Sequence, residues 1–301
     1  MIFINPKIDF AFKKIFGSED SKDILISFLN ALIYEAQPTI QDLEILDPYL
    51  APRIRGIKHT YLDVKAKIID AETGEQRTVI IEMQVLNIEG FEKRILYNAA
   101  KSYSIQLTSG QGYELLNPVI ALTITDFVMF ADLPNVTSRF VLKEKEFLID
   151  YPIYDLELIF VELPKFKKTL PELETIIDKW LFFLNNARKL EDIPATMDNI
   201  PEIKKAFYMA NQASLSVQEL DDQEKSEFFI QDQHGAVTRA VKQAVKQATK
   251  ESLEQGRQEG ITEGSQQKAY EIAEKMLGSF DEQTICQMTG LTLDAIRAIQ
   301  S

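Results

Sequence analysis

Three polar residues in two neighbouring segments have the types and the spacing to hold a metal ion. Asp63 lies in the segment 62–68, and Glu82 and Gln84 lie in the segment 78–85. Side chains on a β-strand alternate between its two faces, so Glu82 and Gln84 would point to the same side. Mg²⁺ prefers oxygen ligands and is usually held by one or two carboxylates, with waters and phosphate oxygens completing its shell. The pattern is typical of a metal-dependent phosphodiesterase.

The two segments predict a β-hairpin. Both are apolar or alternate at the period of a strand, and the stretch between them is rich in turn residues, with a break at Thr73-Gly74. Directly opposed residues of an antiparallel pair have Cβ atoms about 4.5–5.5 Å apart. We therefore expect Asp63, Glu82 and Gln84 to converge in the fold.

Hydrophobic periodicity predicts the elements around this hairpin. Predicted helices cover 10–34, 89–107 and 171–227, and predicted strands lie near 119–125, 137–149 and 154–163. The segment 119–125 is continuously apolar and rich in β-branched residues, as expected for a central strand with both faces covered. The pattern as a whole predicts an α/β protein.

Four motifs occur in an order that resembles a known family. They are Asp9-Phe10-Ala11-Phe12-Lys13-Lys14-Ile15-Phe16-Gly17, Glu82-Met83-Gln84, Arg94-x-x-Tyr97 followed by Tyr103, and Ile159-Phe160-Val161-Glu162-Leu163-Pro164-Lys165-Phe166. Together they resemble the PD-(D/E)XK nuclease superfamily and, within it, the Rpn family of recombination-promoting nucleases, also described as transposases. No single motif would be sufficient, but the ordered set covers most of the chain.

The resemblance implies a fold, an activity and a set of site residues. The fold would be a PD-(D/E)XK restriction-endonuclease-like α/β core, a mixed central sheet flanked by helices, with a helical C-terminal region. The activity would be endonucleolytic hydrolysis of DNA phosphodiester bonds with Mg²⁺ or Mn²⁺, linked to recombination or mobile elements. Carried over by position, Asp63, Glu82 and Gln84 would be catalytic. Asp63, Glu82 and the backbone carbonyl of Met83 would be metal ligands.

Gln84 departs from the superfamily pattern, in which a lysine follows the glutamate by two residues, although the Rpn-type branch commonly has glutamine there. An amide can orient water through hydrogen bonds but carries no charge to place near a phosphate. Lys13, Lys65 or Arg94 could supply that charge. If none does, the chemistry would be slow or absent.

Two other residues have alternative interpretations. Asp9 is either a third acidic ligand or the N-cap of the helix that begins at about residue 10. His59, four residues before Asp63, would either assist proton transfer near neutral pH or be an ordinary histidine on an edge strand.

Bulk properties indicate a folded protein of a reducing compartment. The chain has 301 residues, of which 45% are hydrophobic and 10% aromatic. Its one cysteine, Cys286, excludes an internal disulfide and a cysteine-rich zinc site. Charge at Lys7 comes too early for a signal peptide, and no apolar run approaches the roughly 20 residues of a membrane helix. We expect a cytoplasmic protein that does not span a membrane.

The net charge of −13 weighs against tight, extended binding of DNA by the monomer, because phosphate attraction supplies most non-specific affinity. The acidity is unevenly distributed. Residues 1–110 contain 13 Lys/Arg against 15 Asp/Glu, which leaves a net charge of −11 for the rest of the chain. DNA, bound with little sequence specificity, remains the expected partner.

Composition divides the chain into four regions. They are a PD-(D/E)XK nuclease-like core over 1–170, a helical extension over 171–230, a long polar, coiled-coil-like helix over 231–278 with a Gly-x-x-x-Gly repeat, and a small helical hairpin over 279–301. The long helix carries a narrow apolar stripe over 237–248 that suits a helix pair. Each of Gly256, Gly260 and Gly264 costs a helix about 1 kcal/mol relative to alanine. The repeat therefore indicates close packing of helices or a frayed linker, and a homodimer through this helix is the simplest assembly.

Two other functions compete with the nuclease. One is a catalytically idle fold that acts as an oligomerising interaction protein, which Gln84 and the acidic charge favour. The other is a regulator like flagellar assembly protein H, a resemblance that covers only about 256–264. The terminal hairpin also resembles a helix-turn-helix, with a core of Ile285, Met288, Leu291 and Ile296. The second helix of this hairpin has one cation, Arg297, so packing explains the hairpin better than DNA reading.

Overall fold

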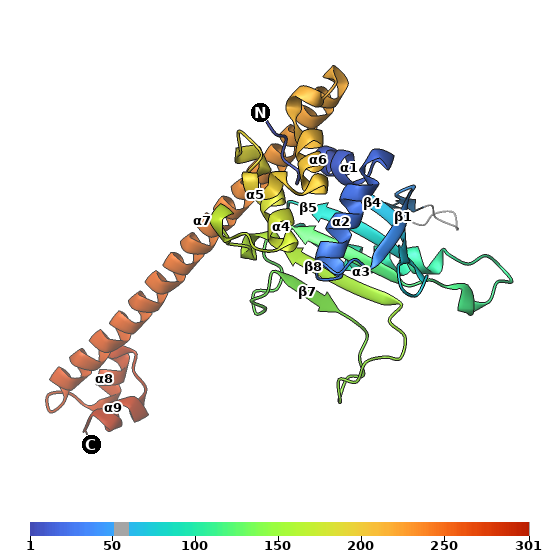
Figure 1. Cartoon of the computed structure of the whole chain (residues 1–301). Coiled ribbons are helices and arrows are strands. Elements are labelled where there is room, and N and C mark those ends of the chain that lie inside the picture. The colour runs from blue at the N-terminus through green and yellow to red at the C-terminus, as the bar shows by residue number, and fades with distance from the viewer. Residues whose placement is uncertain (51–59, 301) are drawn as a thin grey trace. The chain divides into compact units, whose positions relative to one another are not determined.

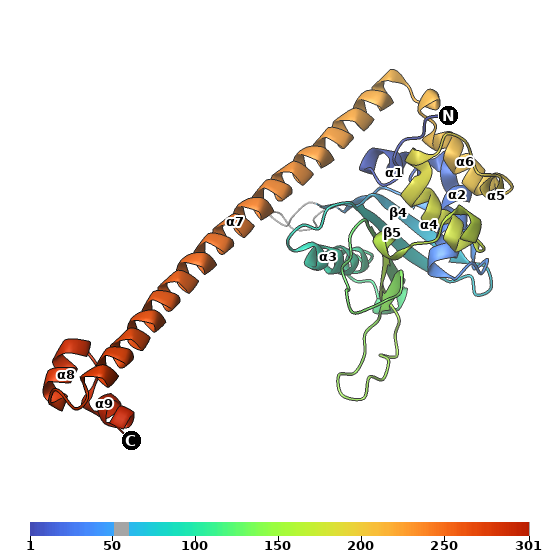
Figure 2. The same ribbon diagram turned by 90° about the vertical axis from the view of Figure 1, so that its left-hand side faces the viewer.

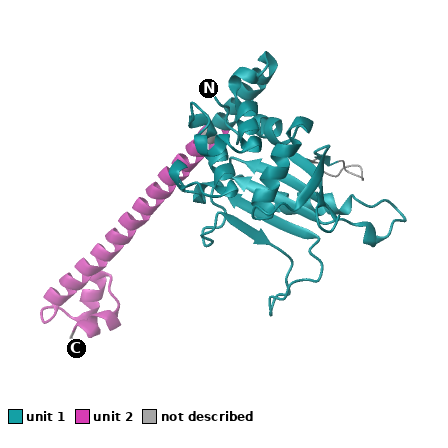
Figure 3. Cartoon of the chain, viewed as in Figure 1, with its two compact units in different colours: residues 1–232 teal, residues 233–301 magenta. Residues whose placement is uncertain are grey.

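The computed structural model describes residues 1–50 and 60–300 and divides into two compact units, Met1–Asp232 and Gln233–Ser301 (Figure 3). His59 lies outside the described residues.

A mixed six-stranded sheet is the centre of the first unit (Figure 1). Its strand order is β1-β4-β5-β6-β8-β7. The strands are β1 (Ile40–Leu46), β4 (Val64–Asp70), β5 (Gln76–Gln84), β6 (Val119–Thr125), β7 (Thr137–Phe140) and β8 (Leu156–Glu162). β5, β6 and β8 are parallel neighbours, whereas β1, β4 and β7 join the sheet antiparallel. A separate ribbon pairs β2 (Tyr49–Leu50) with β3 (Thr60–Tyr61). The predicted mixed sheet is confirmed.

The predicted hairpin is the antiparallel pair β4–β5. Its turn begins at Asp70, whose carboxylate accepts hydrogen bonds from the backbone N–H groups of Glu72 and Thr73 at 3.0 and 2.9 Å. Gly74 then takes a φ of 70°, a left-handed conformation that favours glycine. The strand predicted near 137–149 is shorter than expected, because the chain leaves the sheet after Phe140 and turns back through Leu148, which has a φ of 56°.

Each face of the sheet is covered by a different set of helices (Figure 2). Alternate residues such as Val64, Ile81 and Leu122 pack against α1 (Asp9–Phe16), α2 (Lys22–Ile33), α4 (Ile176–Asn186) and α6 (Pro201–Ala210). On the opposite face, Ile80 and Ala121 pack against α3 (Phe91–Ser104). Residues of β5 with even numbers, Glu82 among them, therefore belong to the face that α3 covers.

The remaining helices are α5 (Ala195–Asp198), α7 (Val217–Met276), α8 (Glu282–Thr289) and α9 (Leu293–Gln300). In the second unit, Ile285 and Ile296 of the terminal hairpin pack with Ala273 and Met276 from the end of α7. Met288, expected in this core, is instead exposed, because the end of α7 fills the space between the two short helices. None of the helices within 1–50 and 60–300 has the length and apolar character needed to cross a membrane.

Gly17 lets the end of α1 approach the start of β4. A Cβ at this position would lie 2.8 Å from the carbonyl oxygen of Lys13 and 3.2 Å from Cγ2 of Val64. The glycine of the first motif therefore fixes the distance between α1 and the residue beside Asp63.

We expect Gly17→Ala to destabilise the protein by about 1–3 kcal/mol, because the added methyl group would clash with the Lys13 carbonyl at the end of α1 and press on Val64 of β4. Thermal unfolding measures this loss. Gly235→Ala is the control, since that glycine lies in α7 with no described atom within 4 Å of an added Cβ. An equal or smaller loss for Gly17→Ala than for the control would contradict the argument.

Candidate functional site

The register of the hairpin brings Asp63 and Glu82 together. β4 begins at Val64, which pairs with Ile81, so Asp63 just before Val64 lies near Glu82 just after Ile81. Asp63 directly precedes β4, and its Oδ2 accepts a hydrogen bond of 2.7 Å from the backbone N–H of Met83. This hydrogen bond and the mutual electrostatic effect of the two groups place both carboxyl groups at the same end of the β4–β5 hairpin.

The first helix adds a cation and a third carboxylate. Lys13 Nζ lies 2.7 Å from Asp9 Oδ1 and 3.9 Å from Asp63 Oδ1. Asp9 does not cap α1, which was one of its two expected roles: the N-cap is Ile8, and Asp9 is the first helical residue. Its side chain is thereby directed to Lys13, one turn further along the helix.

The third helix holds Glu82 and Gln84 from the α3 side. Arg94 Nη2 donates to Glu82 Oε2 at 3.0 Å and to Gln84 Oε1 at 2.7 Å. Asn98 Nδ2 donates to Glu82 Oε1 at 2.5 Å. Gln84 is fixed at its other end, where its Nε2 donates to the carbonyl of Leu86 at 2.7 Å. Arg94 thus places a positive charge beside the residue that stands in the lysine position of the superfamily.

Asn98 is the contact that the sequence did not single out. It is buried, with 1% of its surface exposed, and its Oδ1 has no hydrogen-bond partner among the described residues. Arg94 and Asn98 are four residues apart on α3, so both reach the same carboxylate from one face of the helix. That spacing next to a motif glutamate is the signal that could have identified Asn98.

Lys65, a possible source of the missing charge, and Glu162 of the last motif have different surroundings. Burial lowers the pKa of Lys65, and the nearby charge that opposes this shift is Asp47. Glu162, fully buried, accepts hydrogen bonds from the backbone N–H groups of Met129 and Phe130 at 2.6 and 3.0 Å and pairs with Lys165. The last motif therefore fixes the loop that follows β6.

Burial sets the protonation of the two paired carboxyl groups. It raises the pKa of Asp63 from 3.8 to about 8; the Met83 N–H opposes this rise, and the charges of Asp9 and Glu82 add to it. Burial also raises the pKa of Glu82, although Arg94 and Asn98 favour its ionised form. A cation bound between the two groups would favour the charged form of both.

The donor set fits an ion that takes few protein ligands. Asp63 and Glu82 supply two carboxylates, and a carboxylate oxygen that accepts one hydrogen bond keeps another lone pair. In the described part of the chain no group of three or more His, Cys, Asp or Glu side chains is arranged to hold a metal. Mg²⁺ matches this arrangement, since it keeps several waters and is bound through one or two carboxylates plus phosphate oxygens.

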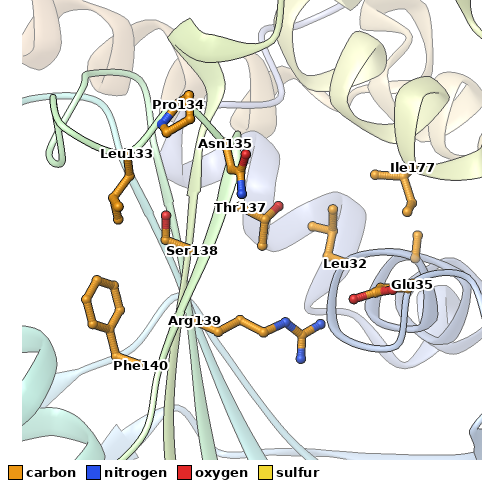
Figure 4. Close-up of a pocket in the computed structure, with 11 residues that line it drawn as sticks. Leu32, Glu35, Leu133, Pro134, Asn135, Thr137, Ser138, Arg139, Phe140 and Ile177 are labelled. Atoms are coloured by element: carbon orange, nitrogen blue, oxygen red, sulfur yellow. The ribbon is translucent and has the colours of Figure 1, made fainter. Parts of the chain in front are cut away.

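A cavity of about 570 Å³ lies elsewhere, between β7 and α2 (Figure 4). Arg139 and Phe140 point to opposite sides of β7, with Arg139 directed towards the helix that carries Leu32. The guanidinium of Arg139 is already bound to Glu157 and to the carbonyl of Ile33. None of the residues that line this cavity belongs to the carboxylate site.

The raised pKa of Asp63 predicts how stability depends on pH. A native state that binds the proton more tightly than the unfolded chain loses stability as the pH rises from the unfolded to the folded pKa. The asparagine side chain of the Asp63→Asn variant has no ionisable group, so this variant does not lose stability in this way. We therefore expect the Tm of Asp63→Asn minus the Tm of the wild type to rise as the pH increases from 4 to 8 in the presence of a chelator.

Thermal unfolding at successive pH values measures the difference in Tm between the two proteins. Glu92→Gln is the matched control, because Glu92 is exposed on α3. If the Tm difference between Asp63→Asn and the wild type changes with pH no more than that of the control, the raised pKa of Asp63 is contradicted.

Comparison with known proteins agrees with the arrangement of the sheet. Searches of curated proteins and of solved structures found no significant match. The sequence profile described as "PD-(D/E)XK nuclease family transposase" matches residues 6–240, which include the whole sheet and all the helices that cover it. The chain therefore belongs to the PD-(D/E)XK nuclease family transposases.

Proposed function

We propose that this protein is an endonuclease that hydrolyses DNA phosphodiester bonds with Mg²⁺ or Mn²⁺, in recombination or in the movement of a mobile element. The observation that carries the proposal is the pair of partly buried Asp63 and buried Glu82 at one end of the β4–β5 hairpin, with Arg94 beside Gln84. Family membership supports a nuclease role. The single cysteine is consistent with a protein that acts in the cytoplasm.

Asp63 and Glu82 would hold the ion, with the carbonyl of Met83 as a further ligand. When bound, Mg²⁺ or Mn²⁺ supplies electrostatic polarisation of the scissile phosphate. The N–H of Met83 orients Asp63, and Asn98 orients Glu82. Both carboxylates are thereby restricted before substrate arrives, which lowers the cost of assembling the site.

Arg94 would take the electrostatic role of the missing lysine. Its guanidinium is held by Glu82 and Gln84 and lies over the ring of Phe91, with 5.0 Å from Cζ to the ring centroid. A fixed cation next to developing negative charge lowers the barrier without reorganising during the reaction. Gln84 then acts by positioning Arg94, and Lys13 is a second cation on the α1 side of Asp63.

The competing proposal is a catalytically weak or idle fold that serves as an interaction protein. It is favoured by Glu82, since both of its oxygens already accept hydrogen bonds from the protein. The flagellar alternative rests on about 256–264 alone, whereas the family match covers residues 6–240 and supports a nuclease.

Nicking of supercoiled plasmid with Mg²⁺ or Mn²⁺ tests the nuclease directly. Asp63→Asn and Glu82→Gln should abolish nicking, because each removes a ligand charge. Arg94→Gln should lower the rate by about 10²-fold, as loss of a preorganised cationic donor does. Arg94→Lys should fall between this variant and the wild type, because an ammonium cannot reproduce the planar guanidinium. Glu92→Gln is the control and should nick normally.

A second measurement separates an idle fold from an unsuitable substrate. Mn²⁺ should raise the Tm of the wild type, since an ion bound only to the native state stabilises it, and should leave Asp63→Asn unchanged. A wild type that neither nicks plasmid nor gains stability from either ion would support the idle fold.

We also propose that the chain forms a homodimer through α7. Val237, Val241 and Val245 recur every four residues on this helix and are each about half exposed or more. Gly256, Gly260 and Gly264 follow, and an added Cβ at each would meet no described atom within 4 Å. Within one chain this apolar stripe has no covering surface among the described residues, and a second copy would supply one.

Replacing the three glycines by alanine distinguishes a helix pair from a lone helix. In a lone helix each substitution stabilises by about 1 kcal/mol. In a close pair the added methyl groups separate the helices and weaken the dimer. We expect dissociation of the full-length triple variant at higher concentration than the wild type, measured by light scattering. A wild type that is monomeric throughout the micromolar range would contradict the dimer.

A further inference from the structure

A pocket of about 450 Å³ in the first unit is lined by four lysines. They are Lys7, Lys167, Lys168 and Lys189, and none of the residues that line the pocket is an aspartate or a glutamate. This is unusual in a chain whose net charge is −13. The remaining lining includes Thr169 and the amides Asn185 and Asn186, which are hydrogen-bonding groups without charge.

Half of this positive charge is not neutralised by the residues that the structure describes. Lys7 Nζ bonds both carboxylate oxygens of Asp126 at 2.8 and 2.7 Å, and Lys168 Nζ lies 2.9 Å from Asp178 Oδ2. Lys167 and Lys189 are exposed and form no ion pair with any residue in 1–50 or 60–300. The pocket therefore keeps two solvent-facing positive charges that attract an anion.

The lysines are carried by fixed turns. Lys167 and Lys168 follow the short turn Leu163–Lys165, where Lys165 pairs with the buried Glu162 and also donates to the carbonyl of Phe130 at 2.8 Å. Asn185 donates to the carbonyl of Leu163 at 3.2 Å and so joins this turn to α4. Lys189 ends the turn Ala187–Lys189 directly after α4. Lys167 and Lys189 thus extend from backbone segments that are fixed by hydrogen bonds.

A short chain of contacts connects the pocket to the carboxylate site. Lys7 binds the side chain of Asp126, and the backbone N–H of Asp126 donates to the carbonyl of Gln84 at 3.0 Å. Lys7 also precedes Asp9 of α1 by two residues. The pocket and the site therefore flank the same end of β5 and β6, where parallel strands present their carboxyl ends.

We propose that this lysine pocket binds backbone phosphates of the DNA strand, beside the phosphate that is presented to Asp63 and Glu82. The proposal rests on the proposed nuclease function, since it assigns the path of its substrate. Several cations spread along an open pocket suit a polyanion, because each can contact a different phosphate. The cluster also explains how an acidic chain can hold DNA, since the attraction is concentrated where the strand must lie.

Binding of a labelled DNA duplex, measured by fluorescence anisotropy in chelator, tests the pocket without any cleavage. The double variant Lys167→Gln/Lys189→Gln should bind about tenfold more weakly or worse at low salt, whatever the DNA sequence. The slope of log K against log salt should shrink by about 1.8, as expected for two lost phosphate contacts on a duplex. Lys145→Gln/Lys179→Gln removes the same charge outside the pocket and should bind as the wild type does.

Lys167→Arg/Lys189→Arg should retain binding, which separates loss of charge from loss of fold. Equal weakening in the pocket variant and the control would overturn the proposal, because net charge alone would then explain it. A rise in Tm with inorganic phosphate that only the pocket variant loses, with unchanged DNA affinity, would also overturn it in favour of a small-anion site. Plasmid nicking that persists with unchanged DNA affinity rejects the pocket but not the nuclease. Lost DNA affinity in a protein that never nicks rejects the nuclease but not the pocket.

Discussion

Two carboxyl groups held side by side at one end of a sheet repel each other and lose hydration, which costs free energy when both are ionised. The other residues of the site offset this free-energy cost. The register of β4 and β5 makes Asp63 and Glu82 neighbours. Burial and mutual repulsion raise the pKa of Asp63 to about 8, while Arg94 and Asn98 hold Glu82 from the other side. Such a pair is costly in a protein without a counter-charge and is well suited to one that binds a cation.

Two helices and one loop are positioned around this pair. α1 contributes Lys13 and reaches β4 because Gly17 allows a close approach. α3 contributes Arg94 and Asn98 from one face. The loop after β6 is fixed by Glu162 and Lys165, so the last motif acts on the architecture around the site rather than in it. Gln84 stands where the superfamily has a lysine. Arg94, from the neighbouring helix α3, lies against Gln84 and brings a positive charge to that position.

Local pattern was sufficient to predict what depends on strand period. Alternation placed Glu82 and Gln84 on one face, and the turn at Thr73-Gly74 made Asp63 their neighbour. The apolar run 119–125 predicted β6, which is buried throughout. These features need only the two-residue repeat of a strand and the chemistry of a turn.

Features that depend on docking between distant segments could not be predicted in the same way. Asn98 is a polar residue of a predicted helix, and only the packing of α3 on the sheet buries it against Glu82. Lys7 and Asp126 are 119 residues apart, and the lysine pocket joins three separate stretches of the chain. β7 ends at Phe140, which pairs with Leu158 near the start of β8, so its length depends on a strand further along the chain.

The most direct measurement of the central claim is the position of Mn²⁺ in crystals of the protein, located by anomalous X-ray scattering. Manganese suits this purpose because it accepts the same oxygen ligands as magnesium. The account predicts one strong peak bonded to carboxylate oxygens of both Asp63 and Glu82, absent from crystals of Asp63→Asn. A peak elsewhere, or crystals in which Lys13 and Arg94 neutralise the two carboxylates with no ion between them, would contradict it.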